Sequence, residues 1–474
     1  MDLRELTADP RAPGVDITGL AYSSPSAMPG SLFFCVRGFS ADGHDFAGDA
    51  VRRGAAALVC ERPLGLGVPE LLVDDVRAAM GPVAARFYGD PTGELRVVGI
   101  TGTNGKTTTA FLVRHLLEAA GIRCGLLGTV KRVVGGVDEA VERTTPEAID
   151  LQATFRRMLD AGDRACAMEV SSHALELGRV AGIRFACRLF TNLTQDHLDF
   201  HDSMEAYFAA KRRLFEGPGA AIVNVDDDYG RRLAAEHEVT TVAIERDADI
   251  RALDVRLDVG GARFRCVTPD GDVELTSSLP GLFNVENALC AVAAALALGV
   301  GLETVRGALP RFRRVPGRFE PVDEGQDFGV LVDYAHTPDS LENVLRAARG
   351  LTSGRLTVVF GAGGNRDRGK RPLMGAAAAR LADRTIVTSD NPRDERPEAI
   401  VDEILAGAGP TVERELDRRR AIALAVEGAA PGDVVVIAGK GHEQGQEFER
   451  GRKEPFDDVT VAREALRARL AAHA

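Results

Sequence analysis

The stretch LRVVGITGTNGKTTTAFLVRHLLEAAG, residues 95–121, decides the fold of the chain around it. It begins with an apolar, β-branched run and ends with the apolar spacing of a helix that stops at Gly121. A strand, a glycine-rich loop, a lysine with a hydroxyl and then a helix form the order of a phosphate-binding loop. This stretch therefore predicts a parallel α/β sheet and a nucleotide site.

Within the loop, the backbone amides of Gly102 to Gly105 are expected to face phosphate oxygens. Lys106 would reach the outer phosphates, and the Thr107 hydroxyl would coordinate Mg²⁺. The strict pattern requires glycine at the position of Ile100, so the motif is a variant. The alternative interpretation is a glycine turn with a solvated lysine.

A second glycine-rich loop, VVFGAGGNRDRGK at 358–370, also follows a strand-like run. In a dinucleotide fingerprint its third glycine would stand where the chain has Arg366. A nicotinamide enzyme is therefore not expected.

The composition of the 474 residues is that of a globular protein, with 45% hydrophobic and 27% charged residues. A net charge of −12 argues against nucleic-acid or membrane-surface binding. The seven cysteines show no C-x-x-C spacing, and the start of the chain has no apolar signal segment, so a cytoplasmic protein is expected. The longest apolar run, NALCAVAAALALGVGL at 287–302, predicts a buried helix and no membrane insertion.

Strand-like runs alternate with helical patterns along most of the chain, which predicts an α/β protein with parallel sheets. Candidate linkers lie at 87–96 and 311–322, where glycine and proline interrupt the pattern. They divide the chain into blocks of 1–90, 91–318 and 319–474, which are ordinary domain sizes.

Polar residues with metal-binding chemistry occur at two places in the middle block. Glu169 ends the apolar run ACAME and could be a second Mg²⁺ ligand, although an ordinary strand-end acid has the same pattern. His197 and His201 have a spacing that could indicate zinc on a helix, but they precede the helix that Asp202 or Ser203 would cap.

Lys211 falls on the apolar stripe of that helix, four residues after Tyr207. One interpretation is a lysine that snorkels at the rim of the core. The other is a lysine of the metal site, and since an ammonium cannot ligate Mg²⁺ it would require conversion to an oxygen donor such as a carbamate.

The stretch VTSDNPRDERP, residues 387–397, follows another strand-like run. In open α/β sheets ligands bind at the loops after strand ends, but a solvated turn is the more common occurrence of such a sequence. The local sequence leaves both interpretations open.

Several motifs together resemble the Mur ligase family. They are, in chain order, TGTNGKTT, MEVSSHAL, TNLTQDHLDFH, LPGLFNVENALCA, VPGRFE, DYAHTPDSL, GAGGNRDRGKRPLMG, DNPR and GKGHE, within residues 97–447. The resemblance implies three domains: an N-terminal UDP-binding α/β domain, a central P-loop ATPase-like domain and a C-terminal Rossmann-like domain. It also implies an ATP- and Mg²⁺-dependent amide ligase of peptidoglycan synthesis that works through an acyl phosphate.

The resemblance implies the following site residues. The ATP contacts would be Gly102, Thr103, Asn104, Gly105, Lys106, Thr107, Thr108, Asn287, Arg318 and Asp333. The contacts to UDP-MurNAc-L-Ala-D-Glu would be Ser23, Thr144, Thr145, Ser171 and Arg179. The metal shell would be Thr107, Glu169, His197 and Lys211, with Lys211 as N6-carboxylysine. The amino-acid contacts would be Arg366, Asp390, Asn391, Pro392, Arg393, Gly439 and Glu443.

The resemblance also implies the amino acid that is added. An arginine fork suits a carboxylate and a glutamate suits an ammonium, and DNPR is similar to the pattern of relatives that add meso-diaminopimelate. A lysine-adding or folylpolyglutamate-type ligase, a P-loop switch and a carrier of UDP-sugars are the alternatives. Tyr22-Ser23-Ser24 replaces the family's Asp-Ser-Arg, so only Ser23 is carried over there. A monomer is expected, and His336 and His442 are the candidates for the general base.

Overall fold

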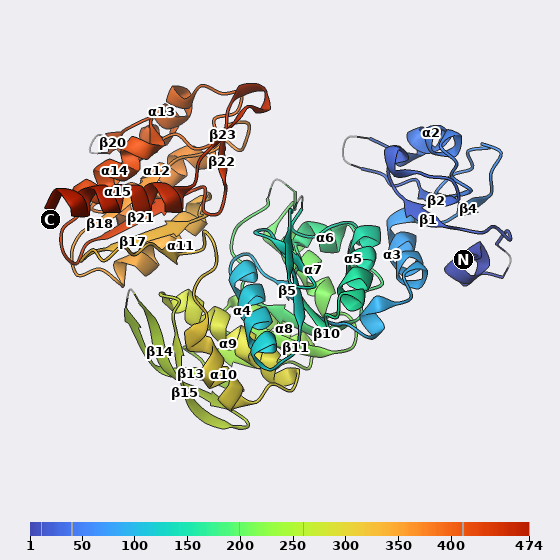
Figure 1. Ribbon diagram of the computed structural model, residues 1–474, viewed down its shortest axis with the longest axis horizontal. Coiled ribbons are helices and arrows are strands. Elements are labelled where there is room, and N and C mark those ends of the chain that lie inside the picture. Colours follow the sequence, from blue (N-terminus) through green and yellow to red (C-terminus); the bar gives the residue numbers. More distant parts are fainter. Residues whose placement is uncertain are drawn as a thin grey trace.

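The computed structural model describes residues 1–10, 12–38, 41–141, 143–198, 200–258, 260–409 and 412–473. The described elements form three units, and the N-terminal and C-terminal units lie on either side of the central one (Figure 1). Their main sheets lie within 19–72, 96–277 and 320–438, inside the three ranges expected from the linkers.

The N-terminal unit is a parallel sheet in the order β1-β2-β3-β4 with short helices around it. Its elements are α1 (Leu3–Thr7), β1 (Gly19–Ala21), β2 (Ser31–Phe34), α2 (Ala47–Arg52), β3 (Ala57–Cys60), β4 (Glu70–Leu72) and α3 (Val76–Phe87). Helix α3 begins at its N-cap Asp75, whose side chain accepts from the amides of Arg77 and Ala78. It leads toward the central unit and packs on α5.

The central unit is built on one sheet in the order β15-β14-β13-β12-β11-β10-β5-β9-β6-β7-β8. Its strands are β5 (Arg96–Thr101), β6 (Cys124–Leu127), β7 (Arg132–Val134), β8 (Val137–Glu139), β9 (Ala165–Glu169), β10 (Phe185–Phe190), β11 (Ala220–Asn224), β12 (Thr240–Ala243), β13 (Ile250–Asp258), β14 (Gly261–Thr268) and β15 (Gly271–Ser277). Its helices are α4 (Lys106–Ala119), α5 (Ala148–Asp160), α6 (Ser172–Glu176), α7 (Met204–Arg212), α8 (Asp228–Glu236), α9 (Leu282–Ala297) and α10 (Leu302–Ala308).

The middle of this sheet is parallel, and β5 lies between β10 and β9. One face is covered by α4 and α9, which share a core with the strands, and the other by α5 and α7. Helix α4 buries Ala110, Val113 and Leu117, which are three to four residues apart and so lie on one face. The carboxyl end of β5, where the glycine-rich loop begins, therefore lies between two layers of packed side chains.

The C-terminal unit has a sheet in the order β16-β17-β21-β18-β19-β20, parallel except for β16. Its elements are β16 (Glu320–Pro321), β17 (Gly329–Asp333), α11 (Pro338–Arg349), β18 (Leu356–Phe360), α12 (Lys370–Leu381), β19 (Arg384–Val387), α13 (Pro397–Ala408), β20 (Glu413–Arg414), α14 (Arg418–Glu427), β21 (Val434–Ala438), β22 (Gly445–Glu447), β23 (Lys453–Pro455) and α15 (Asp458–His473). Strands β22 and β23 form a separate antiparallel hairpin.

The main sequence expectations for the fold agree with these elements. The predicted α/β class with parallel sheets is confirmed, and the apolar run at 287–302 lies largely in α9, a buried helix. None of the helices in the described part of the chain combines the length and apolar content needed to cross a bilayer. All seven cysteines are buried and free.

Candidate active site

The glycine-rich loop turns sharply between β5 and α4. Gly102 and Gly105 have φ angles of 148° and 86°, a region that side-chain-bearing residues rarely adopt. A Cβ on Gly102 would overlap the Thr191 hydroxyl, and one on Gly105 would overlap the Asn287 amide oxygen. Glycine is thus required at both positions by conformation and by space.

Two of the four backbone amides expected to face phosphate donate hydrogen bonds within the protein. The amides of Thr103 and Asn104 donate to the backbone and side-chain oxygens of Asn192, both at 2.9 Å. Lys106 lies over the loop, with its Nζ 2.9 Å from the Gly102 carbonyl and 2.8 Å from the Thr103 carbonyl. The expectation for the amides was wrong for these two residues, because the neighbouring strand-end loop supplies acceptors that the local motif does not contain.

Lys211 lies beside the loop and is 1% exposed. Its Nζ donates to the same Gly102 carbonyl at 2.8 Å and lies 4.6 Å from the centroid of the Tyr207 ring. Burial, with a smaller contribution from the charge of Lys106, places the pKa of Lys211 well below its ordinary value. The snorkelling interpretation is therefore wrong. Helix α7 begins at Ser203, one of the two caps expected, and directs this lysine inward.

Glu169 and Thr107 supply the oxygen donors of the predicted metal shell. Glu169 ends β9 and accepts from the Thr129 amide at 2.8 Å and the Thr129 hydroxyl at 3.2 Å. A carboxylate has about four lone-pair sites, so these two bonds leave it able to ligate a cation. Thr107 is buried in the first turn of α4.

His197 and Lys211 fit the predicted metal shell less directly. An ammonium has no lone pair for a metal, so Lys211 fits only after conversion to an oxygen donor. His197 has a φ of 52° and packs its ring 4.9 Å from the His173 ring. Among the described residues no three histidine, cysteine or acidic side chains form a metal-binding group. The oxygen donors of Thr107 and Glu169 suit Mg²⁺ in their chemistry, and all four assignments remain predictions.

The predicted nucleotide contacts outside the loop have structural partners of their own. Asn287 is buried, accepts from the Thr109 hydroxyl at 3.3 Å and donates to Asn284. Asp333 accepts the amides of Phe319 and Ala335, both at 2.7 Å. It thereby fixes the chain where it enters the C-terminal unit.

Arg318 lies within the second predicted linker, at 311–322. Its guanidinium stacks 4.7 Å from the Tyr334 ring, and its buried Nε has no hydrogen-bond partner among the described residues. A buried donor without a partner is available to a ligand.

The predicted UDP-substrate residues gather between the N-terminal and central units. Thr144 lies 3.0 Å from the Thr129 hydroxyl, and Thr145 donates to the Glu169 carbonyl at 2.9 Å and accepts from the Ser171 amide. Thr145 does not cap α5, whose N-cap is Glu147. Its hydroxyl is used instead to join two strand-end loops.

Three arginines surround one carboxylate in the same region. Glu147 is 4% exposed and pairs with Arg179 at 3.0 Å, Arg143 at 3.1 Å and Arg77 at 3.0 Å. Arg77 lies on α3, so the cluster bridges two units and carries an excess of positive charge. Sequence reasoning identified Arg179 and missed Arg77, because the two are 102 positions apart and nothing local marks Arg77.

The altered segment Tyr22-Ser23-Ser24 lies near this cluster. The Tyr22 hydroxyl donates to Asp150 of α5 at 2.7 Å, and Ser23 lies 2.6 Å from the Ser26 hydroxyl. Tyr22, Thr144 and Asp150 line a cavity of about 480 Å³. Tyr22 thus makes a direct contact between the two units.

A larger cavity of about 570 Å³ lies between the central and C-terminal units. Six of the seven residues predicted to hold an amino acid line it: Arg366, Asp390, Asn391, Arg393, Gly439 and Glu443. Pro392 does not line it, and its carbonyl accepts from the Glu395 amide. The opposite wall includes Asp196 and His197 of the loop before α7. The stretch that could have been a solvated turn is therefore part of a cavity wall.

Arg393 is held in the cavity wall by contacts on two sides. Its φ is 52°, its Nε donates to Glu447 at 2.9 Å and its Nη1 donates to the Gly364 carbonyl at 2.8 Å. Its amide also donates to the Glu447 carbonyl. The β22–β23 hairpin thus fastens the DNPR loop from outside the sheet.

Asn391 is oriented by a buried lysine. The Nζ of Lys440, which is fully buried, donates to the Asn391 amide oxygen at 2.8 Å. The Asn391 nitrogen in turn donates to Glu443 at 2.7 Å. This network fixes which end of the Asn391 side chain faces Glu443. Sequence reasoning missed Lys440, although a lysine two residues after an apolar strand was a usable signal.

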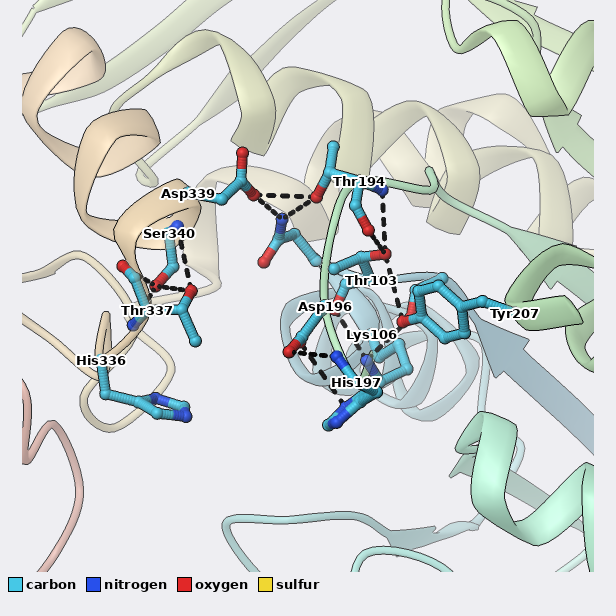
Figure 2. Close-up of polar contacts among 12 residues, drawn as sticks. Thr103, Lys106, Thr194, Asp196, His197, Tyr207, His336, Thr337, Asp339 and Ser340 are labelled. Carbon is cyan, nitrogen blue, oxygen red and sulfur yellow. Dashed lines mark hydrogen bonds and ion pairs between the residues drawn. The ribbon is translucent and has the colours of Figure 1, made fainter. Parts of the chain in front are cut away.

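The central and C-terminal units are joined at the entrance to this cavity. Asp339, in the first turn of α11, accepts from the Thr194 hydroxyl at 2.8 Å and from the Asn104 amide group at 3.5 Å (Figure 2). Asn104 belongs to the phosphate loop. The loop is therefore joined by a hydrogen bond to the unit that carries most of the cavity lining.

A glycine-rich loop on the central unit and a charged cavity against the C-terminal unit are the two features that the predicted nucleotide-dependent ligase requires. The chain belongs to the Mur ligase family, because three models of that family match it. The model described as the Mur ligase family catalytic domain matches residues 16–88, the Mur ligase middle domain matches residues 100–295, and the Mur ligase glutamate ligase domain matches residues 317–441. The family and the fold class predicted from the motifs are confirmed.

The most similar curated relatives include two UDP-N-acetylmuramoyl-L-alanyl-D-glutamate--2,6-diaminopimelate ligases. The protein from Geobacillus kaustophilus is 48% identical and covers 96% of both chains. The protein from Synechococcus elongatus is 46% identical over the full length of both.

The fold is also that of solved Mur ligases. A solved ligase with the same name as these relatives is 34% identical, covers 99% of both chains and superposes with a TM-score of 0.74. The MurF ligase from Thermotoga maritima, solved in complex with ADP, is 18% identical with a TM-score of 0.64 and shares the fold. The superposition covers 96% of this chain and 98% of the MurF chain.

Proposed function

We propose that this chain is the ATP-dependent ligase that adds meso-diaminopimelate to UDP-N-acetylmuramoyl-L-alanyl-D-glutamate in peptidoglycan precursor synthesis. The observation that carries the proposal is the cavity lined by Arg393, Asn391 and Glu443, with Asp196 and His197 of the central unit also in its lining. The cavity offers a guanidinium for a carboxylate and carboxylates for an ammonium, which suits an amino acid with both groups at its far end. Relatives 45–48% identical are named for this reaction, and the predicted activity agrees with them.

The reaction proceeds in two steps. A terminal carboxylate oxygen of the UDP-linked dipeptide attacks the γ-phosphorus of ATP, and ADP leaves. The amine of the amino acid then attacks the acyl carbon, and phosphate leaves as the C–O bond breaks. Lys106 and the amides at the start of α4 face the phosphates, and the Arg179–Arg143–Arg77 cluster supplies positive charge for the anionic dipeptide substrate.

Mg²⁺ would be held by Thr107 and Glu169, and when bound it neutralises charge on the phosphates. Lys211 becomes a third oxygen donor as a carbamate. Its burial supports this role, because among the described residues it contacts a carbonyl, the Thr101 hydroxyl and an aromatic ring, none of which is an anionic partner. His197 completes the shell from the cavity side. The protein acts in the cytoplasm as a monomer on small-molecule substrates.

The proposal is tested by measuring phosphate release and product mass with the UDP-linked dipeptide, ATP and one amino acid at a time. Release with meso-diaminopimelate, and little with L-lysine or glutamate, is the expected result. Release with L-lysine alone would overturn the specificity. Phosphate release with none of the amino acids would overturn the ligase activity and favour a nucleotide switch.

A further inference from the structure

The structure separates the two histidines that the sequence offers as general base. His336 lines the cavity between the central and C-terminal units, whereas His442 does not. The His442 ring packs 5.1 Å from the Tyr334 ring, and its Nδ1 is buried without a hydrogen-bond partner among the described residues. Burial, with the charge of Arg318, lowers the pKa of His442 to about 4. His442 is therefore the weaker base and lies outside the lining of this cavity.

His336 stands where the two substrates of the proposed reaction must meet. It lies between β17 and α11, and its ring extends toward the side on which Asp196 and His197 lie (Figure 2). The same cavity is lined by Asp390 and Arg393 on the amino-acid side. A group in this position can reach a molecule that bridges from the amino-acid wall to the phosphate loop.

The hydrogen bonds of His336 fix its tautomer. Its Nδ1 lies 2.8 Å from the Tyr334 carbonyl, and since a carbonyl oxygen only accepts, Nδ1 carries the hydrogen. In the neutral ring the lone pair is then on Nε2. The Nζ of Lys370 donates to the His336 carbonyl at 2.9 Å and fixes the backbone. The ring is thereby presented with its basic atom away from the main chain.

The charges around His336 favour the neutral ring. The side chain of His336 is exposed on the cavity wall, and desolvation by the surrounding protein is the main cause that lowers its pKa, with Lys370 of α12 and Arg318 acting in the same direction. Asp196 and the hydrogen bond to Tyr334 act in the opposite direction. A ring that is neutral at pH 7 is able to accept a proton.

We propose that Nε2 of His336 is the general base that takes a proton from the incoming amino group. The N–H bond of the ammonium breaks, its electron pair stays on nitrogen, and the proton moves to Nε2. The amine then forms the new C–N bond, the C–O bond breaks with its electron pair on the departing phosphate, and the second amine proton leaves with that phosphate. This inference rests on the proposed function, because it requires an amine that attacks an acyl phosphate.

The test is the pH dependence of ligation by His336→Gln. A positioned general base contributes about 10²- to 10⁴-fold, so kcat at pH 7 is expected to fall by at least about 100-fold with little change in the KM for ATP. The deficit should shrink as pH rises, because more of the amine is then unprotonated in solution. Hydroxylamine, an amine largely unprotonated at neutral pH, should still be converted to the hydroxamate by the variant.

Two outcomes would overturn the inference. One is a His336→Gln enzyme whose pH profile parallels that of the wild type, and the other is an equal loss with hydroxylamine and with the amino acid, which would mean that activation of the carboxylate is impaired. His237→Gln is the matched control, since His237 follows α8 and does not line the cavity. Absence of ligation by the wild type would instead refute the proposed function.

Discussion

Replacement of Arg393 by lysine tests the amino-acid site most directly. In the structure Nε and one hydrogen of Nη1 are used by Glu447 and the Gly364 carbonyl. The N–H groups of Nη2 and the second N–H of Nη1 are left to donate, and together they can donate two hydrogen bonds to one carboxylate. A lysine keeps the charge but has all its donors on one atom, so it cannot satisfy these two acceptors and also bind a carboxylate with two hydrogen bonds.

The expected magnitude follows from the bond that is lost. One charge-assisted hydrogen bond contributes about 1.5–3 kcal/mol, which corresponds to a rise of about 10- to 150-fold in the KM for meso-diaminopimelate. The KM for ATP should change by less than about threefold, because none of the predicted ATP contacts lines the cavity that holds Arg393.

Steady-state phosphate release at varied concentrations of each substrate gives both KM values. Glu447→Gln is the companion variant. It should also raise the KM for meso-diaminopimelate, but by less, since it weakens the contact that orients the guanidinium and leaves the guanidinium in place. Equal increases in the two KM values of Arg393→Lys would refute the assignment of Arg393 as the carboxylate fork.

Two further predictions concern buried cations. Lys211→Ala is expected to abolish turnover, with partial recovery in bicarbonate, and the native enzyme should show a mass increase of one CO₂; full activity of an unmodified enzyme in carbonate-free buffer would contradict this. Arg371 is fully buried between Glu395 and Glu403, so Arg371→Leu should lower the free energy of unfolding by about 3 kcal/mol in a denaturant titration. The hydrogen bonds of Arg371 lower the pKa of Glu395 from 4.5 to about 2. The stability from this pair is therefore present above pH 4.5 and is lost as pH falls toward 2, and an unchanged acid limb in Arg371→Leu would show that the pair is not its source.

The sequence was sufficient where one short stretch contains the whole physical signal. The β5–loop–α4 segment carries its own strand pattern, glycines and helix start, and the inward position of Lys211 follows from its spacing to Tyr207 on one helix. The resemblance to a family then placed the DNPR stretch in a site, which its local residues could not do.

The sequence was insufficient where a contact joins distant segments. Lys440 orients Asn391 across 49 positions, Glu447 holds Arg393 across 54, and Asp339 meets Thr194 across 145. No local pattern records such pairs. The same reason explains the loss of the Thr103 and Asn104 amides to Asn192, since the acceptors come from another strand end.

The contact of Asp339 with Asn104 and Thr194 has a mechanical consequence. Asn104 is part of the loop that faces the nucleotide, and Asp339 begins the first helix of the unit that carries the amino-acid wall. Separation of the two units must break these hydrogen bonds. A change in the shape of the loop therefore also changes the hydrogen bonds that hold the two units together. Occupation of the loop by a nucleotide would in this way set the width of the cavity into which the second substrate enters.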